Sequence, residues 1–445
     1  MWLLRPLGMN EFEIENGVLK KYRGDEKSIV IPGGVEVIGE HAFTSQSTVT
    51  EITIPEGVTV IEKYAFSDCP SLKRVTIPNG VKHIGDHAFL WCVSLSELHI
   101  PDSVTAIGDA AFAFCHKMQK ATLPNGITCI PTSIFSNCAE LKEITLPDSV
   151  TKIEEHAFNG CASLTELTIP EGVTEIGMGA FERCDSLKSI RIPDGIKIIS
   201  TRLLNGCTEL TEIILPPSVT VIEDGAFAQC RALEVIQLPD SITEIGEEAF
   251  IYCSSLRKLM LPKGVTVISD GMLAHCNSLA EFCIPDNITR IENKAFENCS
   301  SLLELTVPDS VTEISRTAFF ELSPSVRLHI KHEFMDVLEE KACGEAWVGA
   351  IRGFLIRYYA GNVDQTEKEG WIAYLTKRCK RAFKHFLNEP MLYGFFTENE
   401  LLTRDRTEFL LDRTENAQCR ALLLEYGIRF KKINTDGASD IFDIN

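Results

Sequence analysis

The fold is decided by the stretch Leu164-Thr-Glu-Leu-Thr-Ile169-Pro170-Glu-Gly-Val173-Thr-Glu-Ile176-Gly-Met-Gly-Ala180-Phe181-Glu-Arg-Cys184, a pattern that the chain writes repeatedly. Its proline recurs every 23 residues with no insertion or deletion. The prolines are Pro32, Pro55, Pro78, Pro101, Pro124, Pro147, Pro170, Pro193, Pro216, Pro239, Pro262, Pro285 and Pro308. A fixed period of this length indicates an array of stacked structural units. We therefore expect a solenoid.

Each repeat carries apolar residues at eight fixed positions. In the repeat that begins at Pro55 they are Val58, Ile61, Ala65, Phe66, Cys69, Leu72, Val75 and Ile77. The segment Leu-x-x-Ile-x-Ile alternates with period two, which predicts a short strand that ends at the next proline. Val-Thr-x-Ile predicts a second extended piece, and the Ala-Phe pair predicts a single helical turn. Stacked turns bury these columns at the ~4.8 Å spacing of parallel strands, which gives a right-handed solenoid.

The full pattern, Leu-Pro-Asp-Ser-Val-Thr-x-Ile-x-x-x-Ala-Phe-x-x-Cys-x-Ser-Leu-x-x-Ile-x-Ile, resembles the BspA-type leucine-rich repeat over about residues 26–331. The resemblance implies an α/β repeat fold, a curved leucine-rich repeat solenoid of about 13 rungs with short parallel strands on its concave face. It also implies a bacterial or protist protein engaged in adhesion or protein–protein contact, and many such relatives are secreted.

The domain organisation follows from where the period begins and ends. Residues 9–25 place Asn16-Gly17 between two short apolar runs, which predicts a hairpin cap over the first rung. Residues 26–331 form the repeat solenoid, residues 332–434 a small all-α domain, and the acidic end 435–445 a disordered tail.

Helical spacing is visible in three segments after the last repeat, 334–343, 345–359 and the stretch from Trp371 to Phe386. Farther on, Thr397 looks like the start of a helix with a capping box. The run 415–427 resembles the second helix of an ankyrin unit, and Gly427 is expected to end it.

The chain's one basic cluster lies opposite the apolar face of the Trp371–Phe386 segment. It consists of Lys377, Arg378, Lys380, Arg381, Lys384 and His385. Three explanations remain open: a solvated helix face, a surface for an acidic partner or for the acidic repeats, and a contact with nucleic acid.

The formal net charge of -20 belongs mostly to the repeats. Residues 332–445 hold 16 basic and 19 acidic residues, which leaves 27 basic and 44 acidic residues in the rest of the chain. Because a phosphate-binding surface needs clustered Lys and Arg, we expect no nucleic-acid partner for the repeats. The acidity favours partners with neutral or basic surfaces.

Sixteen cysteines raise the question of disulfides or metal. Eleven share one column: Cys69, Cys92, Cys115, Cys138, Cys161, Cys184, Cys207, Cys230, Cys253, Cys276 and Cys299. Their parallel orientation and odd number favour a ladder of buried, reduced thiols. No Cys-x-x-Cys or Cys-x-x-His pair occurs, so we expect no metal site and no cofactor. Reagents should reach Cys283, Cys129 and the cysteines of the helical domain.

Neither an enzyme nor a membrane protein is indicated. On the column expected to face outward, Cys283 and His329 lie two rungs apart, about 10 Å, whereas a nucleophile and its base need ~3 Å. No apolar run reaches the ~18 residues of a membrane span. The first nine residues lack the features of a signal peptide, so we expect a cytoplasmic protein, with Met9 as a plausible alternative start. Surface exposure or secretion by another route is the alternative.

A candidate protein-binding patch emerges on the strand face of the later repeats. Its residues are Arg191, Ile214, Val235, Gln237, Met260 and Cys283, with Leu303 near the margin. Apolar side chains with a polar rim are typical of an interaction site. The alternatives are a patch covered by the helical domain, or neutral drift.

These observations favour a non-enzymatic scaffold for protein–protein recognition, which binds through the concave face, the helical domain or both. A surface or secreted adhesin is the second hypothesis. An enzyme with its site in the helical domain is the third. The partner and the oligomeric state are not specified by the sequence.

Overall fold

The structure, a computed structural model, describes residues 11–323, 325–338 and 344–433. The predictions for Met9, for the tail 435–445 and for the side chain of Lys380 lie outside the described residues. The chain divides into two units. The first comprises Met1–Leu302 and Ser310–Phe320, and the second comprises Leu303–Asp309 and Glu321–Asn445.

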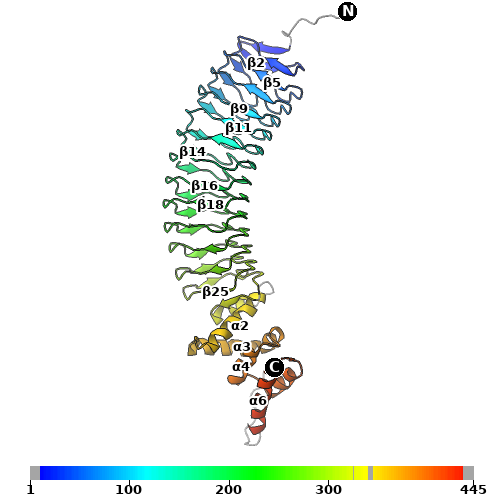
Figure 1. The fold of residues 1–445 in the computed structure, drawn as a ribbon, viewed down its shortest axis with the longest axis vertical. Helices are drawn as coiled ribbons and strands as arrows, with labels where there is room; N and C mark the ends of the chain where they lie inside the picture. Colours follow the sequence, from blue (N-terminus) through cyan, green and yellow to red (C-terminus); the bar gives the residue numbers. More distant parts are fainter. Residues whose placement is uncertain (1–10, 324, 339–343, 434–445) are drawn as a thin grey trace, which may run out of the picture. The chain divides into compact units, whose positions relative to one another are not determined.

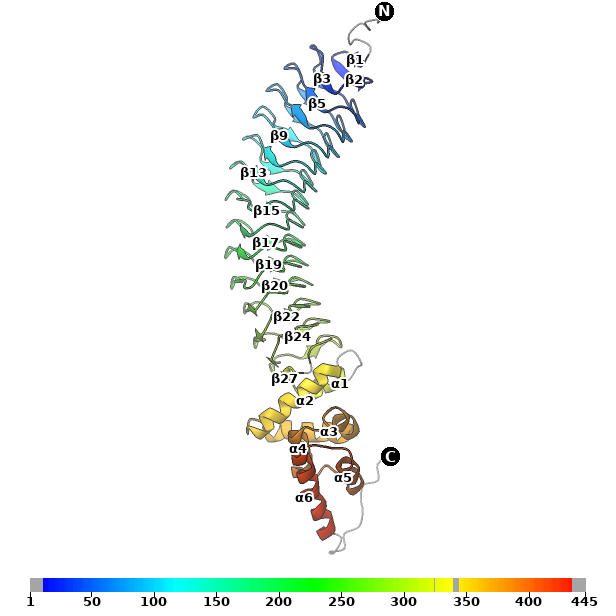
Figure 2. The same ribbon diagram turned by 45° about the vertical axis from the view of Figure 1, so that its right-hand side comes forward.

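A hairpin opens the first unit. Strands β1 (Phe12–Glu15) and β2 (Val18–Tyr22) pair antiparallel, and the turn residues Asn16 and Gly17 have φ of 50° and 77°. A two-residue hairpin turn of this kind needs positive φ at both positions, which explains Asn-Gly. β2 then pairs in parallel with β4 (Val37–Ile38), so the hairpin covers the edge of one sheet (Figures 1 and 2).

One ladder of short parallel strands precedes the prolines, and we call it the proline ladder. Its strands are β3 (Ser28–Val30), β5 (Glu51–Thr53), β7 (Arg74–Thr76), β9 (Glu97–His99), β11 (Lys120–Thr122), β13 (Glu143–Thr145), β16 (Ser189–Arg191), β18 (Glu212–Ile214), β21 (Lys258–Leu259), β23 (Glu281–Phe282) and, in the second unit, β25 (Glu304–Thr306) and β27 (Arg327–His329). Where strands are missing from this period, single parallel bridges join Glu166 to Ser189 and Val235 to Lys258.

The second ladder follows the Val-Thr segments, and we call it the threonine ladder. Its strands are β4, β6 (Val60–Ile61), β8 (His83–Ile84), β10 (Ala106–Ile107), β12 (Cys129–Ile130), β14 (Lys152–Ile153), β15 (Glu175–Ile176), β17 (Ile198–Ile199), β19 (Val221–Ile222), β20 (Glu244–Ile245), β22 (Val267–Ile268), β24 (Arg290–Ile291) and β26 (Glu313–Ile314). In both ladders each residue pairs with the residue 23 positions later, as Ile190 does with Ile213. The predicted parallel-strand solenoid is confirmed, with about 14 turns.

The predicted helical turn at each Ala-Phe pair is wrong. Around Phe181 the chain makes successive tight turns in which Gly179 and Arg183 both have φ of 57°. These left-handed residues break the helical path. The N–H groups of Gly179, Phe181 and Arg183 instead donate to carbonyls 22 residues later. The corner thus joins consecutive turns by hydrogen bonds, which a helix would have used internally.

The core is built from the predicted columns. Phe158 is fully buried, and its ring centroid lies 5.9 Å from those of both Phe135 and Phe181. Where the pair is Leu203-Leu204 or Met272-Leu273, these residues are equally buried. A change of side chain at this column therefore leaves the turn closed, because Leu and Met fill the same interior space.

The second unit contains the predicted helical region. Its elements are η1 (His332–Phe334), α1 (Met335–Leu338), α2 (Gly344–Tyr359), α3 (Gln365–His385), α4 (Pro390–Glu398), α5 (Arg404–Leu411) and α6 (Ala417–Ile433). Helix α2 lies directly on β27, because a Cβ built on Gly353 would come 2.6 Å from the carbonyl oxygen of Leu328. Gly349 makes the same close approach to Val326. Two glycines on one helix face thus allow α2 to close the last strand.

Two predicted helix ends are wrong. Thr397 does not start a helix but lies in the last turn of α4, where its hydroxyl donates to the carbonyl oxygen of Tyr393. The helix start lies at Thr403, whose side chain accepts from the N–H of Arg406 and caps α5. Gly427 does not end α6, which continues to Ile433. A glycine within a helix costs only about 1 kcal/mol, which tertiary packing can override.

Candidate protein-binding site

Two columns of the proline ladder face outward, on either side of a middle residue that turns into the core. The first-residue column reads Glu51, Arg74, Glu97, Lys120, Glu143, Glu166, Ser189, Glu212, Val235, Lys258 and Glu281. The third-residue column reads Thr53, Thr76, His99, Thr122, Thr145, Thr168, Arg191, Ile214, Gln237, Met260 and Cys283. Every candidate residue of the sequence analysis lies in one of these two columns.

The early turns present an ordinary polar surface. Ion pairs link neighbouring turns of the first-residue column, Glu51 with Arg74 at 3.3 Å and Lys120 with Glu143 at 2.9 Å. Exposed threonines fill most of the third-residue column beside them. Exposed pairs of this kind contribute little to stability, and the turns from Glu51 to Thr145 present charged and polar side chains in both columns.

The later turns present apolar side chains in the same columns. The exposed fractions are 45% for Ile214, 54% for Val235 and 71% for Met260, and Cys283 is also exposed. We call these four residues the apolar patch. Arg191 and Ile214 are Cα partners, and Val235 bridges to Lys258 in the same 23-residue register. The structure therefore places the patch residues on adjacent turns of one face, with Gln237 between Ile214 and Met260.

Arg191 lies at the edge of the patch and forms two ion pairs. Arg191 lies 3.4 Å from Glu171 and 3.5 Å from Asp194, both through side-chain atoms. Its guanidinium is therefore fixed at the edge of the patch by two carboxylates. Because methionine and arginine are enriched in protein interfaces, this composition suits a recognition surface.

Sequence reasoning missed Val30, which has an exposed fraction of 69% at the start of the third-residue column. Its place two residues before Pro32 was the signal that could have found it. Leu303, which was expected near the margin of the patch, belongs to the second unit and has an exposed fraction of 64%.

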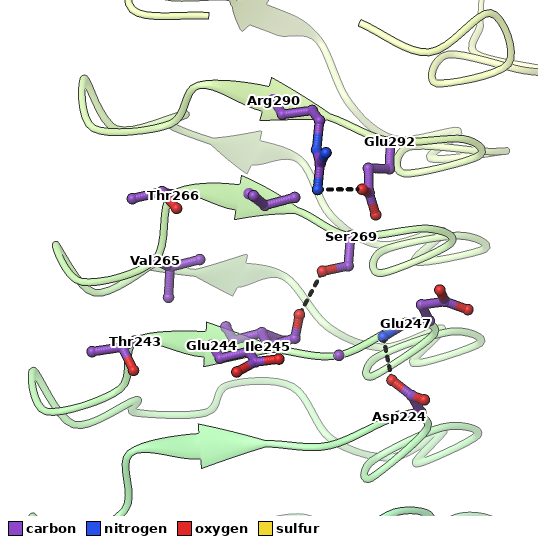
Figure 3. A pocket seen from close by; sticks show the side chains of 12 residues that line it. Asp224, Thr243, Glu244, Ile245, Glu247, Val265, Thr266, Ser269, Arg290 and Glu292 are labelled. Carbon is purple, nitrogen blue, oxygen red and sulfur yellow. Dashed lines mark hydrogen bonds and ion pairs between the residues drawn. The ribbon is translucent and has the colours of Figure 1, made fainter. Parts of the chain in front are cut away.

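A polar hollow of about 460 Å³ opens on the threonine ladder (Figure 3). Asp224, Glu244, Glu247 and Glu292 line it, together with Arg290, which pairs with Glu292 at 2.9 Å. Partial burial, with Asp224 and other nearby carboxylates, raises the pKa of Glu247. Gly246 also lines the hollow, in a column that carries glycine, glutamate, serine or proline on other turns.

His329, one of the two groups considered for catalysis, is engaged within its own unit. The Nε2 atom of His329 lies 2.5 Å from Glu304, and the ring is buried within the second unit. The carboxylate of Glu304 therefore holds the ring in place. Among the described residues, no group of three or more His, Cys, Asp or Glu side chains is placed to hold a metal ion.

The basic cluster on α3 is partly engaged inside the second unit. Arg378 pairs with Asp336 at 3.1 Å, and the guanidinium of Arg381 lies 4.7 Å from the ring centroid of Trp347. Lys377 and Lys384 are exposed. Structural contacts thus account for the two arginines, and the two lysines lie on the exposed face of the helix. Among the described helices, none has the length and apolar composition that crossing a bilayer requires.

Comparison with known proteins supports the repeat assignment. The model of the BspA type leucine rich repeat region matches residues 13–142, 82–211, 128–254 and 199–326. A leucine-rich repeat protein from Bacteroides ovatus is similar at 30% identity, with 64% of this chain and 83% of that chain covered and a TM-score of 0.56. No curated protein matches the chain significantly.

Two further solved structures resemble the chain. A leucine rich cell surface protein from Faecalibacterium prausnitzii is 30% identical over 73% of this chain and 91% of that chain, with a TM-score of 0.50. The pneumococcal vaccine antigen PcpA is 20% identical over 75% and 95% of the two chains, with a TM-score of 0.51. The likeness to PcpA shows a shared fold only.

Proposed function

The chain belongs to the BspA-type leucine-rich repeat family, and on that basis we propose that it is a non-enzymatic scaffold for protein–protein recognition. The observation that carries the proposal is the apolar patch, in two columns that are charged or threonine-rich on the earlier turns. Ile214, Val235 and Met260 expose about half or more of their surface on adjacent turns. Contiguous exposed apolar surface usually marks an interaction site.

The charge of the repeats narrows the class of partner. The chain outside residues 332–445 carries 44 acidic against 27 basic residues. The repeats therefore favour a partner whose docking surface is apolar and carries basic groups opposite their carboxylates. The exposed Lys377 and Lys384 on α3 give the helical unit a separate surface, suited to acidic segments.

A triple substitution tests the patch. Changing Ile214, Val235 and Met260 together to glutamate puts charges at the centre of the surface, and we expect loss of the proteins that wild-type chain retains in a pull-down. The matched control changes Thr122, Thr145 and Thr168 to glutamate, which adds the same charge to the third-residue column on earlier turns. If the patch variant and the control both retain the proteins that wild type retains, the patch is excluded as the binding site. The surface of α3 would then be tested next.

A second candidate function is that of a surface or secreted adhesin. The specific observation in its favour is the similar cell surface protein of Faecalibacterium prausnitzii, at 30% identity. The two functions differ in location, because recognition inside the cell requires a cytosolic protein. Fractionation of the native cells, together with protease shaving of intact cells, separates them: digestion of the protein on intact cells supports the adhesin.

A further inference from the structure

Two unpaired charges of opposite sign flank the centre of the apolar patch. Glu212 and Lys258 occupy the first-residue column on the turns just before and just after Val235. In earlier turns of this column, neighbouring residues of opposite charge form two ion pairs, Glu51 with Arg74 and Lys120 with Glu143. Valine separates the two charges here, and among the described residues neither Glu212 nor Lys258 forms an ion pair. Lys258 is also registered with Glu281, without a contact within ion-pair distance.

The pattern around Val235 is self-complementary. The turn before it carries Glu212 and Ile214, and the turn after it carries Lys258 and Met260. A two-fold axis that runs along the strand direction through the turn of Val235 reverses the order of turns and keeps each column opposite itself. Glu212 then faces the partner's Lys258, and Ile214 faces the partner's Met260.

The same axis places each residue on the turn of Val235 opposite the same residue of the partner. Val235 meets the partner's Val235, and Gln237 meets the partner's Gln237, whose amide both donates and accepts. Glu234 approaches its own symmetry mate, but its carboxylate already pairs with Arg257 at 3.5 Å within its own chain. The isologous contact is therefore apolar at its centre and has two opposite-charge pairs at its sides.

We propose that the partner of the apolar patch is a second copy of this chain, docked face to face about this two-fold axis. This inference rests on the proposed function, since it names the partner of the same surface. The patch spans the turns from Arg191 to Cys283, about 20 Å along the stack at the ~4.8 Å spacing of strands. An interface of this size lies below the ~800 Å² per partner of a stable complex, so the dimer is reversible and depends on concentration.

Charge exchange tests the geometry. By sedimentation equilibrium, the weight-average mass of the full chain rises from 49.5 kDa toward twice that value as concentration rises through the micromolar range. Glu212→Lys alone, or Lys258→Glu alone, brings like charges together at both symmetry-related contacts between residues 212 and 258. Each single variant therefore raises the dissociation constant of the dimer by about tenfold or more. The double variant restores the pairs with their signs exchanged, and its dissociation constant returns to within about threefold of wild type.

The matched control is Glu97→Lys, which reverses an exposed charge of the same column six turns before Val235, far from the contact, and leaves dimerisation unchanged. A chain that stays monomeric at every concentration, or a dimer whose dissociation constant does not respond to either single exchange, overturns the two-fold contact. That failure is distinguishable from failure of the proposed function. A chain that stays monomeric can still retain proteins in the pull-down. If it loses them when Ile214, Val235 and Met260 are changed to glutamate, the patch binds a different protein.

Discussion

The thiol of Cys161 donates to the carbonyl oxygen of Phe135, 26 residues earlier in the chain, at an Sγ–O distance of 3.3 Å. The same bond recurs at all eleven ladder cysteines, with distances of 3.1 to 3.5 Å to the core residue of the preceding turn. The position suits a small side chain with a donor, because the buried carbonyl of Phe135, which already accepts from the N–H of Cys138, gains a second partner. Cysteine meets both requirements.

We predict that the ladder thiols do not react in the native protein. Cys138 is fully buried and burial raises its pKa to about 12, so the reactive thiolate is scarce and inaccessible. A thiol reagent followed by mass spectrometry should label Cys283, which is exposed, and only slowly Cys129, whose pKa is raised to about 11 by burial and by Glu154. In contrast to the expectation from sequence, Cys379 and Cys419 are buried and should stay unlabelled.

Denatured protein is the control for this experiment, because every cysteine should then react. Rapid native labelling of Cys138 or Cys161 would contradict the buried ladder.

Alkaline pH should destabilise the solenoid through the same thiols. Burial raises the pKa of Cys138 and Cys184 from 9.0 to about 12, so at pH 7 both the folded and the unfolded state keep these protons. As pH rises above 9 the unfolded state loses them first, and stability falls between pH 9 and about 12. Within that window each thiol contributes about 1.4 kcal/mol per pH unit.

Urea unfolding measured across this pH range checks the prediction. The variant Cys138→Ala/Cys184→Ala should lose stability less steeply than wild type, by the contribution of two thiols. Identical slopes would show that these groups ionise equally in both states.

Removal of a core ring should destabilise the repeats strongly. Phe158→Ala empties a site between Phe135 and Phe181, and we expect a loss of roughly 3 to 5 kcal/mol from burial and cavity formation. Thr168→Ala changes an exposed residue of the neighbouring proline ladder and should stay within about 0.5 kcal/mol of wild type. Calorimetry of the two variants decides the point: similar melting shifts would mean that the inward columns are misassigned.

The contact between α2 and β27 should not tolerate a methyl group. Gly353→Ala would place a Cβ 2.6 Å from the carbonyl oxygen of Leu328, and overpacking of this kind costs about 1 to 3 kcal/mol. Hydrogen exchange of α2 and β27 should rise in this variant, while exchange in the early turns stays unchanged. Gly126→Ala is the matched control, since nothing lies within 4 Å of its built Cβ. Unaltered exchange in α2 for Gly353→Ala would show that the helix does not rest on this glycine.

Periodic apolar patterns located the repeats and also α2 and α3, whereas single-residue signals for two helix ends failed, for one physical reason. In the repeats, the orientation of one residue is inferred from the equivalent residues of all the turns. Phe158 and Cys161 are therefore assigned to the core by whole columns of similar residues. Thr397 and Gly427 each stand alone, and a capping signal is worth only about 1 kcal/mol. Packing of α4 and α6 outweighs it, and both predicted helix ends were wrong.

The sequence by itself determined the period, the inward columns and the columns in which Ile214, Val235 and Met260 lie, because a 23-residue repeat fixes the register of every strand pair. Only the tertiary structure decided how the corners are closed, since the left-handed Gly179 and Arg183 satisfy backbone groups on the next turn rather than in their own. The tertiary structure also decided that, among the described residues, Glu212 and Lys258 lack an ion pair, whereas Glu51 pairs with Arg74 and Lys120 with Glu143 in the same column. That difference depends on side-chain distances across the stacked turns, which no single repeat contains.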